Sequence, residues 1–233
     1  MKIAVLVSTY NGERYLEKQI QTLLEQDIEG AEIIVRDDGS TDNTRCILQK
    51  YEKNGLLKVQ YGSNIGYKKS FMKLLLDQKD YDYYAFCDQD DVWLPDKLSK
   101  AISKIQEYDK NIPIVYYSNL KKCDENLNIY GETHLEKRVL SLESNILRRS
   151  IAGCTMVMNN RFHDIVTKID MEENLLVQGH DSYLISLCYA IRGKVICDKY
   201  SYILYRQHGN NTSGSSNGVM QRIKKEINFI KKN

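Results

Sequence analysis

The chain has 233 residues and a mass of 27.1 kDa, and 42% of its residues are hydrophobic and 27% charged. This balance is typical of a globular protein and excludes disordered and collagen-like chains. The 33 Lys and Arg residues against 31 Asp and Glu residues give a net charge of +2, which argues against a protein that coats nucleic acid.

The first hundred residues or so alternate between strand and helix patterns. Short apolar runs predict strands over residues 3–7, 32–36, 57–61, 83–87 and 112–118. Apolar residues at helical spacing predict helices over 13–26 and 66–78, and capping signals predict two more, after DDGSTDNT and from Pro95. Repeated strand–helix units indicate an α/β fold, with a mostly parallel central sheet covered by helices on both faces.

The second half of the chain is less regular. CDENLNIYG predicts a short strand–turn segment, and an apolar run predicts a strand over residues 151–158. Further patterns predict helices over 162–169 and 181–191 and late strands over 194–197 and 202–205. Residues 219–233 have the pattern of a basic amphipathic helix. Neither a repeat nor a linker divides the chain, so we expect one domain over 1–218 followed by this helix.

Cysteine usage and hydropathy indicate the compartment. The six cysteines form no CxxC pair, and most lie in apolar segments where a free cysteine is a small buried hydrophobe. No segment approaches the ~20 apolar residues of a spanning helix, and the N-terminal apolar run is too short for a signal peptide. We expect a cytoplasmic protein whose basic helix either packs on the domain or contacts the inner face of the cell membrane.

Polar clusters follow four of the predicted strands directly: STYNGE, DDGSTD, SNIG and DQDD. Ligands of open α/β sheets bind outside the carboxyl ends of the strands, so the clusters together predict a binding site at one edge of the sheet. No GxGxxG follows the first strand and no GxxxxGK[ST] occurs in the chain. The common dinucleotide and P-loop fingerprints are therefore missing.

The DQDD cluster places Asp88, Asp90 and Asp91 after the apolar strand YAFC. Three carboxylates within four residues repel one another unless a cation or a solvated turn relieves them. Their hard oxygen atoms suit Mg²⁺ or Mn²⁺, and such an ion suits a diphosphate leaving group. A simpler explanation is an acidic turn before the helix that starts at Pro95. The place of the cluster at the end of a buried strand favours the functional interpretation.

Three further motifs also have simple structural explanations. DDGSTD is either a capped glycine turn or a source of a carboxylate that accepts a base N–H. Asp181 in QGHDSYL is either a residue favoured at a helix N-terminus or a general base. In YRQHGNN, a lone histidine such as His208 is more often structural than a ligand, and Arg206, like Lys69, either meets phosphates or stays solvated.

Taken in order, STYNGERYLEKQI, DDGSTDNT, NIG, DQDDVWLPDKL, GHDSYL and YRQHGNN resemble the motifs of family-2 glycosyltransferases with the GT-A fold. The similarity runs from about Ile3 to Asn211. DQDDVW with GHD and YRQHGNN looks most like the bacterial branch of rhamnosyltransferases and of O-antigen and capsule transferases. The resemblance implies one domain over 1–218, with a nucleotide-binding half over about 1–120 and an acceptor half over about 121–218.

The resemblance also implies a reaction. It implies a metal-dependent, inverting enzyme that moves a sugar from a nucleotide-diphosphate donor to a hydroxyl of a cell-surface glycan or a lipid-linked acceptor. The branch suggests rhamnose from dTDP-rhamnose, and a UDP-hexose or UDP-HexNAc is the second candidate donor. Two competing functions are a non-catalytic nucleotide-sugar-binding subunit of a polysaccharide assembly complex and a sugar-1-phosphate nucleotidyltransferase, whose Gly-rich loop is missing after the first strand.

Matched position by position, the resemblance implies roles for individual residues. Asp181 matches the catalytic base, and Mn²⁺ or Mg²⁺ is assigned to Asp88, Asp90, Asp91 and His208. The nucleotide-sugar site is assigned to Thr9, Tyr10, Asn11, Glu13, Asp38, Asn64, Gly66, Lys69, Gln89 and Arg206. The acceptor site is assigned to Trp93, Gly153, Cys154 and His180, and His180 stands where many relatives carry Glu.

Overall fold

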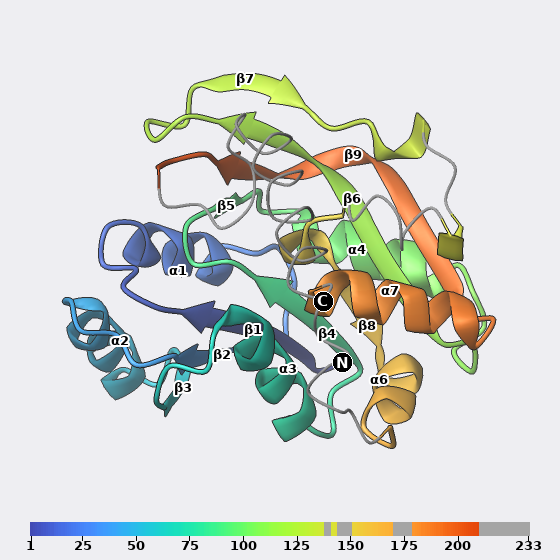
Figure 1. Ribbon diagram of the computed structural model, residues 1–233, viewed down its shortest axis with the longest axis horizontal. Helices are drawn as coiled ribbons and strands as arrows, with labels where there is room; N and C mark the ends of the chain where they lie inside the picture. The colour runs from blue at the N-terminus through green and yellow to red at the C-terminus, as the bar shows by residue number, and fades with distance from the viewer. Residues whose placement is uncertain (138–140, 144–150, 170–178, 210–233) are drawn as a thin grey trace, which may run out of the picture.

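The structure is a computed structural model that describes residues 1–137, 141–143, 151–169 and 179–209. Within these residues, nine strands form one sheet with helices on both faces (Figure 1). The strands are β1 Ile3–Thr9, β2 Ala31–Asp37, β3 Lys58–Tyr61, β4 Tyr83–Cys87, β5 Val92–Trp93, β6 Ile114–Cys123, β7 Ile129–Glu132, β8 Val157–Asn159 and β9 Lys194–Arg206. The helices are α1 Leu16–Leu24, α2 Thr44–Lys53, α3 Tyr67–Asp77, α4 Lys97–Gln106, α6 Asn160–Val166 and α7 His180–Ala190, with 3₁₀ turns η1 Leu135–Lys137 and η2 Gly153–Thr155.

The sheet is mostly parallel, as the sequence predicts. Its strand order is β3-β2-β1-β4-β8-β6-β9-β5, and β7 pairs with β6 outside this path. Parallel pairs join β1 with β2 and β4, β2 with β3, and β6 with β9. β8 runs antiparallel to both β4 and β6, so β4 and β6 point the same way. The carboxyl ends of β1, β2, β3, β4, β6 and β9 therefore meet at one edge.

One face of the sheet carries α1, α2 and α4. Leu16, Ile20 and Leu23 recur at the helical spacing predicted for α1, and all three are buried in one core cluster with Ile102 and Ile105 of α4. The residues of β1 are buried on both faces of the sheet, as expected for a central strand of a sheet with two helical layers. A continuous apolar run is therefore the correct sequence signal for this strand.

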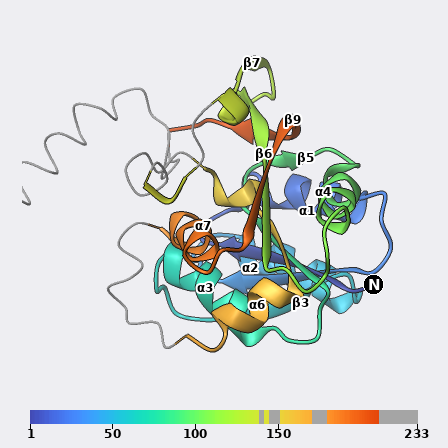
Figure 2. The ribbon, with the colours of Figure 1, turned by 90° about the vertical axis from the view of Figure 1, so that its right-hand side faces the viewer.

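The opposite face carries α3, α6 and α7. Phe71 and Leu75 of α3 share a second core cluster with Phe162 of α6 and with Leu184 and Cys188 of α7. In the turned view of Figure 2, α3 and α7 lie on one side of β6 and β9, and α1 and α4 lie on the other. The two clusters bury both faces of the sheet and hold its carboxyl edge in place.

Two predicted elements differ in the structure. The strand predicted over residues 151–158 is wrong in its first half, because Gly153–Thr155 form a 3₁₀ turn and only Val157–Asn159 pair in the sheet. A buried turn and a buried strand have the same apolar signature. The two predicted late strands are one strand, β9, whose pairing with β6 shifts after Asp198. The bulge interrupts the alternation of side chains and hides the continuity of the strand.

The predicted helix over 219–233 lies outside the described residues. Among the helices that the structure describes, none is both long enough and apolar enough to cross a bilayer.

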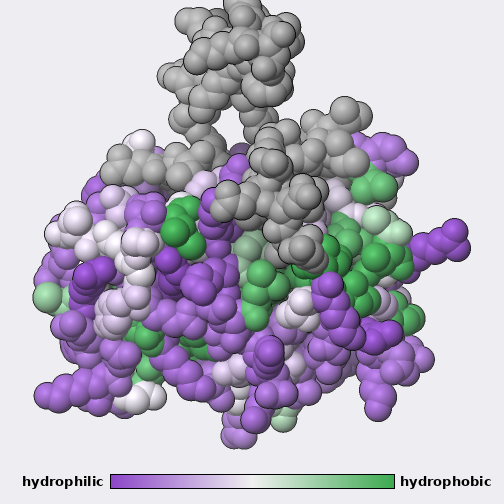
Figure 3. Space-filling model, turned by 60° about the horizontal axis from the view of Figure 1, so that its bottom comes forward, coloured by the Kyte–Doolittle hydropathy of each residue, from purple (hydrophilic) through white to green (hydrophobic). Residues whose placement is uncertain are grey.

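On the face shown in Figure 3, polar side chains cover most of the surface and apolar side chains gather on one side. Tyr10 and Tyr67, which lie near the carboxyl edge of the sheet, are 45% and 46% exposed.

Candidate active site

The candidate site lies at the edge where the parallel strands end. We call residues 9–13, 37–44 and 62–66, which begin at the ends of β1, β2 and β3, the first three loops. We call residues 88–91, which follow β4, the acidic loop. The last residue of β9, Arg206, reaches the acidic loop from the other half of the sheet, because its backbone N–H donates to Asp91 Oδ1 at 3.1 Å. The four polar clusters of the sequence thus share one edge.

Gln89 joins the acidic loop to the loop after β1. Its side-chain oxygen accepts from Thr9 Oγ1 at 2.6 Å and from the backbone N–H of Tyr10 at 2.9 Å. Its side-chain nitrogen donates to the carbonyl of Tyr10 at 3.2 Å. These three bonds bring together Thr9, Tyr10 and Gln89, which the sequence assigns to the nucleotide sugar, and leave the ring of Tyr10 at the surface.

The loops after β1 and β2 hold each other. The backbone N–H of Asn11 donates to Ser40 Oγ at 2.9 Å, and Asn11 Oδ1 accepts from the backbone N–H of Thr41 at 2.9 Å. Asn11 has φ 48°, a left-handed conformation in which asparagine is enriched. Glu13 accepts from the backbone N–H of Asn43 at 2.8 Å. Asn11 and Glu13 therefore shape the backbone of these loops.

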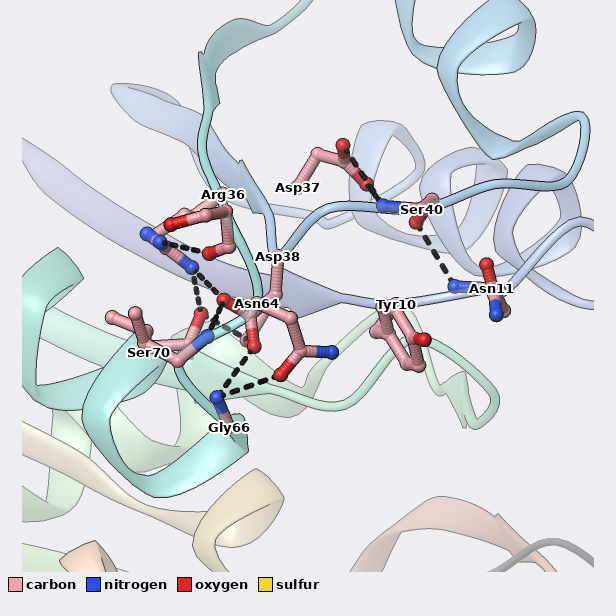
Figure 4. A network of polar contacts seen from close by, with 12 residues as sticks. Tyr10, Asn11, Arg36, Asp37, Asp38, Ser40, Asn64, Gly66 and Ser70 are labelled. Carbon is pink, nitrogen blue, oxygen red and sulfur yellow. Dashed lines mark hydrogen bonds and ion pairs between the residues drawn. The ribbon is translucent and has the colours of Figure 1, made fainter.

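Asp38 ties the loop after β2 to the loop after β3 (Figure 4). Its side chain is 2% exposed and accepts from the backbone N–H groups of Ile65 and Gly66, both at 2.9 Å. It also forms an ion pair with Arg36, which is 4% exposed. Asn64 Oδ1 accepts a second bond from Gly66 at 3.1 Å. The structure thus brings together Asp38, Asn64 and Gly66, three of the residues that the resemblance assigns to the nucleotide-sugar site.

The acidic loop is electrostatically strained. Burial, followed by the charges of Asp90 and Asp181, raises the pKa of Asp88. Burial, followed by the charges of Asp90 and Asp88, raises the pKa of Asp91 well above its usual value. Asp91 is fully buried, and its Oδ2 has no hydrogen-bond partner among the described residues. An unpaired buried carboxylate oxygen is costly and calls for a cation or a proton.

Two residues from the end of β9 border the acidic loop. His208 Nε2 lies 2.7 Å from Asp90 Oδ2, which brings the histidine and the acidic cluster together. Arg206 Nε donates to the carbonyl of Asp90 at 2.8 Å, and its guanidinium also donates to the carbonyl of Glu125. The centroid of the Tyr15 ring lies 4.5 Å from the Arg206 guanidinium and 5.0 Å from the His208 ring. The described contacts of Arg206 thus brace the loop from inside.

Asp181 stands at the N-terminus of α7, opposite the acidic loop. Its Oδ1 accepts from the backbone N–H of Ser182 at 2.7 Å, and the preceding Gly179 has φ 108°, which favours glycine. Asp181 is close enough for its charge to raise the pKa of Asp88 and of Tyr67, where burial is the larger cause in both. The predicted base therefore lies close to Asp88, one of the predicted metal carboxylates.

His180 is buried among aromatic rings. It stacks on Phe71 with ring centroids 4.5 Å apart and meets the edge of Phe86 at 5.0 Å. Neither ring nitrogen has a hydrogen-bond partner among the described residues, and burial lowers the pKa of the imidazole, which keeps it neutral. A Cβ added to Gly153 would lie 2.7 Å from His180 Nε2, so η2 contacts the start of α7 closely.

The remaining predicted acceptor residues lie deeper. Cys154 is fully buried, and its Sγ lies within 4.8 Å of carboxylate oxygens of Asp88 and Asp91. Trp93 is 2% exposed, and the Lys97 ammonium lies 3.6 Å from the centroid of its ring. Both side chains are buried rather than at the surface, and Cys154 lies beside the acidic loop. Lys69, by contrast, is exposed on α3.

The acidic residues fit a divalent cation. The cluster offers several carboxylate oxygens, one of them a buried oxygen of Asp91 without a partner among the described residues, and the His208 nitrogen lies beside Asp90. Oxygen-rich sets of this kind suit Mg²⁺ and Mn²⁺ better than softer metals. The thiol of Cys154 is the one soft group of the set formed with Asp88 and Asp91. The donor chemistry therefore supports the ions predicted from the sequence.

Several residues of the site were missed from the sequence. Arg36, Ser70 and Lys97 are 4%, 0% and 1% exposed and lie directly behind the predicted residues. Arg36 ends an otherwise apolar strand, IIVR, and a charge at the end of a buried run is a signal that could have been read. Ser70 lies on the apolar face of α3, where a hydroxyl needs a partner. Lys97 gave no such signal, because lysines begin many exposed helices.

Comparison with known proteins identifies the family. The family model for Glycosyl transferase family 2 matches residues 4–166. Over 94% of this chain and 77% of the relative, the chain is 28% identical to the dTDP-rhamnosyl transferase RfbG of Shigella flexneri. The matched range begins at β1 and ends at the last residue of α6.

Solved structures share the fold. S. aureus TarS 1-349 in complex with UDP-GlcNAc has a TM-score of 0.70 at 21% identity, over 97% of this chain and 65% of that chain. The mannosyltransferase PcManGT of Pyrobaculum calidifontis, in complex with GDP-Man and Mn²⁺, has a TM-score of 0.61 at 16% identity, over 90% of this chain and 58% of that chain. The chain thus spans less than two thirds of either solved protein.

Proposed function

Because the chain belongs to glycosyl transferase family 2 and has the GT-A fold, we propose that it transfers a sugar from a nucleotide-diphosphate donor to an acceptor hydroxyl with inversion at the anomeric carbon. One observation carries the proposal: the acidic loop, with an unpaired buried oxygen on Asp91, lies close enough to Asp181 for the charge of Asp181 to act on Asp88. Acidic groups brought together in this way suit a leaving diphosphate held through a cation and a separate proton acceptor.

On the donor side, the first three loops hold the nucleotide. Thr9 and Asp38 face the base, the exposed ring of Tyr10 stacks on the nucleoside, and Asn64 and Gly66 line the same wall. Asn11, Glu13 and Gln89 fix the backbone of these loops through the hydrogen bonds described above. Lys69 supplies positive charge at the edge of the site, and the buried Arg206 supplies it behind the acidic loop.

Asp181 acts as the general base. Its carboxylate takes the proton of the acceptor hydroxyl while the acceptor oxygen bonds to the anomeric carbon and the bond to the diphosphate breaks. General-base assistance of this kind contributes ~10²–10⁴-fold to a rate. Gly179 and the Ser182 N–H fix the orientation of the carboxylate, because Asp181 Oδ1 accepts from that N–H at 2.7 Å. His180 and Gly153 border the acceptor beside it, with Cys154 and Trp93 as the support beneath.

Asp88, Asp90, Asp91 and His208 would hold Mn²⁺ or Mg²⁺. When bound, the ion neutralises the charge that develops on the leaving diphosphate. Asp90 and His208 are only partly buried, and their side chains are 16% and 11% exposed. Asp91 is fully buried and is held by the backbone of Arg206, which suits a residue that supports the others from below.

The donor that we favour is dTDP-rhamnose. The reason is the similarity, over 94% of this chain, to a Shigella flexneri protein that is named a dTDP-rhamnosyl transferase. A UDP-hexose or UDP-HexNAc is the second candidate, and the UDP-GlcNAc complex of TarS favours it. The acceptor is a glycan or a lipid-linked glycan. A non-catalytic nucleotide-sugar-binding subunit would bind the donor without turnover.

A donor screen tests the function. The thermal midpoint is measured with dTDP-rhamnose, UDP-glucose, UDP-galactose and UDP-GlcNAc in the presence of Mn²⁺, and release of the nucleoside diphosphate is then measured with a panel of glycan acceptors. A true donor at a hundredfold excess over its dissociation constant stabilises the protein by ~2.7 kcal/mol. No stabilisation by any of the four nucleotide sugars would contradict both proposed donor classes, and binding without turnover over the whole acceptor panel would favour the non-catalytic subunit.

The metal has its own test. Chelation with EDTA should abolish turnover, and Mn²⁺ or Mg²⁺ should restore it. Mn²⁺ alone should raise the thermal midpoint of the wild type, and Asp90→Asn should lose this increase, because one carboxylate charge is removed from the set. The matched control is Asp82→Asn, an exposed aspartate before β4, which should keep it. Turnover that survives exhaustive chelation would contradict metal dependence.

A further inference from the structure

A buried ion pair lies behind the loop that is proposed to face the base. Arg36 and Asp38 are 4% and 2% exposed, and their side chains form a direct ion pair (Figure 4). Buried ion pairs contribute little net stability, because removing two charges from water costs about as much as their attraction returns. Stability alone therefore does not account for a charged pair at this place.

Arg36 is held by more than the aspartate. Its Nη2 donates to the carbonyl of Ser63 at 3.0 Å, and its Nη1 donates to Ser70 Oγ at 3.2 Å. Ser70 Oγ in turn accepts from Ser8 Oγ at 2.6 Å, so the network reaches from β2 to β1 and α3. A Cβ added to Gly62 would lie 2.5 Å from Arg36 Nη2, so glycine leaves the room that the guanidinium occupies. The guanidinium has a fixed position.

The fixed guanidinium decides what Asp38 can do. An ionised carboxylate accepts hydrogen bonds at about four lone-pair positions and donates none. Three positions are filled, because Oδ1 accepts from Arg36 and from the Ile65 N–H, and Oδ2 accepts from the Gly66 N–H. One acceptor position on Oδ2 remains for a ligand.

We propose that Arg36 is the positioning residue that fixes Asp38 as a pure acceptor and thereby selects, among the pyrimidines, a base with a ring N–H, which is uracil or thymine rather than cytosine. The inference rests on the proposed function, in which Asp38 faces the base. The ring nitrogen of cytosine at the same edge is itself an acceptor, so it would meet the carboxylate oxygen without a proton between them. A site built to accept a ligand N–H rejects an analogue that lacks it.

The test compares UDP with CDP, which have the same phosphates and similar size. Dissociation constants are measured by calorimetry with Mg²⁺ for the wild type, Arg36→Gln, Arg36→Lys and Gly62→Ala. In Arg36→Gln, UDP affinity should fall about 10- to 100-fold while CDP affinity changes little, because a hydrogen bond to a charged group is lost. Arg36→Lys should restore part of the ratio, since lysine keeps the charge without the fork of donors.

Gly62→Ala gives the same test without a change of charge. The added methyl would displace the guanidinium, and φ at Gly62 is not in the left-handed region, so the UDP/CDP ratio should fall in a folded protein. This variant decides the matter if Arg36→Gln does not fold. Two controls should keep the ratio: Gly131→Ala, where nothing lies within 4 Å of the added Cβ, and Arg45→Gln, which breaks the ion pair of the neighbouring Asp37.

The outcomes separate the two levels of the inference. Equal affinity of the wild type for UDP and CDP would overturn the assignment of Asp38 and the role of Arg36 with it. A preference for UDP that Asp38→Asn abolishes, but that Arg36→Gln and Gly62→Ala keep, would overturn the role of Arg36 alone. Equal weakening of UDP and CDP in the Arg36 variants would also overturn it, because a merely structural residue has that effect.

Discussion

The first three loops and the acidic region, which we define as the acidic loop with Trp93, Lys97, His180 and Asp181, satisfy their polar groups in opposite ways. All residues of both regions are described by the structure. In the first three loops no buried side-chain nitrogen or oxygen lacks a hydrogen-bond partner. In the acidic region, unpaired buried atoms occur on four side chains: Asp91, Trp93, Lys97 and His180.

The difference indicates a division of labour. Loops whose polar groups are already paired hold their shape before a ligand arrives, and a nucleotide that binds there loses little free energy to reorganisation of the protein. Unpaired buried groups can still form a hydrogen bond or an ionic contact, and a cation, a proton or a substrate that binds there gains this interaction. The first region is therefore preorganised for recognition, and the second is incomplete until the reactants are present.

The largest expected effect is on turnover. Asp181→Asn should lower the rate of transfer by ~10²–10⁴-fold, because the amide cannot take the acceptor proton. The dissociation constant for UDP should stay close to that of the wild type, since the first three loops are untouched. Rates are measured as release of the nucleoside diphosphate with a proven acceptor. Asp164→Asn, an exposed aspartate on α6, is the control. Full activity of Asp181→Asn would remove it from the base role.

The next effect concerns stability against pH. Burial lowers the pKa of Lys97 from 10.5 to about 8, so between these values the unfolded chain binds more protons than the folded protein. Stability from this group therefore rises with pH over that window, by about 3 kcal/mol when it is complete. The charged ammonium destabilises the fold below pH 8, and the cost is relieved above it.

Lys97→Met isolates this term. The free energy of unfolding in urea is measured for wild type and variant at pH 7, 9 and 10, and the difference between them should shift in favour of the wild type as the pH rises. Burial raises the pKa of the nearby Cys87 and Cys154 thiols well above its ordinary value, which adds a separate pH dependence, but both thiols are present in wild type and variant. A difference that does not vary with pH would show that Lys97 has partners in solution.

A smaller effect tests the paired region. Ser40→Ala removes the acceptor of the Asn11 N–H and should lower the free energy of unfolding by about 1 kcal/mol. Because the loop after β1 then loses one of its hydrogen bonds to the loop after β2, UDP binding should weaken as well. Ser63→Ala, which removes an exposed hydroxyl from the same loops, should do neither. Unfolding and binding that are both unchanged in Ser40→Ala would contradict the preorganisation of these loops.

The smallest effect tests the unpaired region. His180→Leu replaces an imidazole without hydrogen-bond partners among the described residues by an apolar side chain of similar volume. The free energy of unfolding should stay within about 1 kcal/mol of the wild type or rise, because no internal hydrogen bond is lost. The measurement is urea unfolding at pH 7. A loss of several kcal/mol would mean that both ring nitrogens are satisfied in the folded protein.

The sequence predicts the fold well where patterns are local. Continuous apolar runs located β1, β2 and β4, and helical spacing located α1 and α3, because central strands and amphipathic helices have distinct periods. Non-local pairing was invisible: β5 has two residues, and it becomes a strand only because β9 lies beside it. The 3₁₀ turn at Gly153 was not predicted for the same reason, since Gly153 contacts the start of α7, which is distant in the sequence.

The polar residues at the ends of the strands could be predicted from the sequence, and most of the buried residues that support them could not. The polar clusters can be recognised in the sequence because each places carboxylate or amide side chains directly after an apolar strand. Arg36, Lys97 and Arg206 are buried charges, and of the 33 basic residues in the chain only Arg36, at the end of an apolar run, gave a local sign of its burial. Their environment is made by strands and helices far apart in the chain, and only the fold brings these together.

The bond from the backbone of Arg206 to Asp91 spans 115 residues of sequence. During synthesis the acidic loop therefore leaves the ribosome long before the strand that braces it, and contacts of such high sequence separation form late in folding. The first three loops need no residue beyond Gln89 for the bonds described here, and they can close early. The polar contacts that shape the proposed nucleotide wall are thus more local in sequence than those that complete the acidic loop.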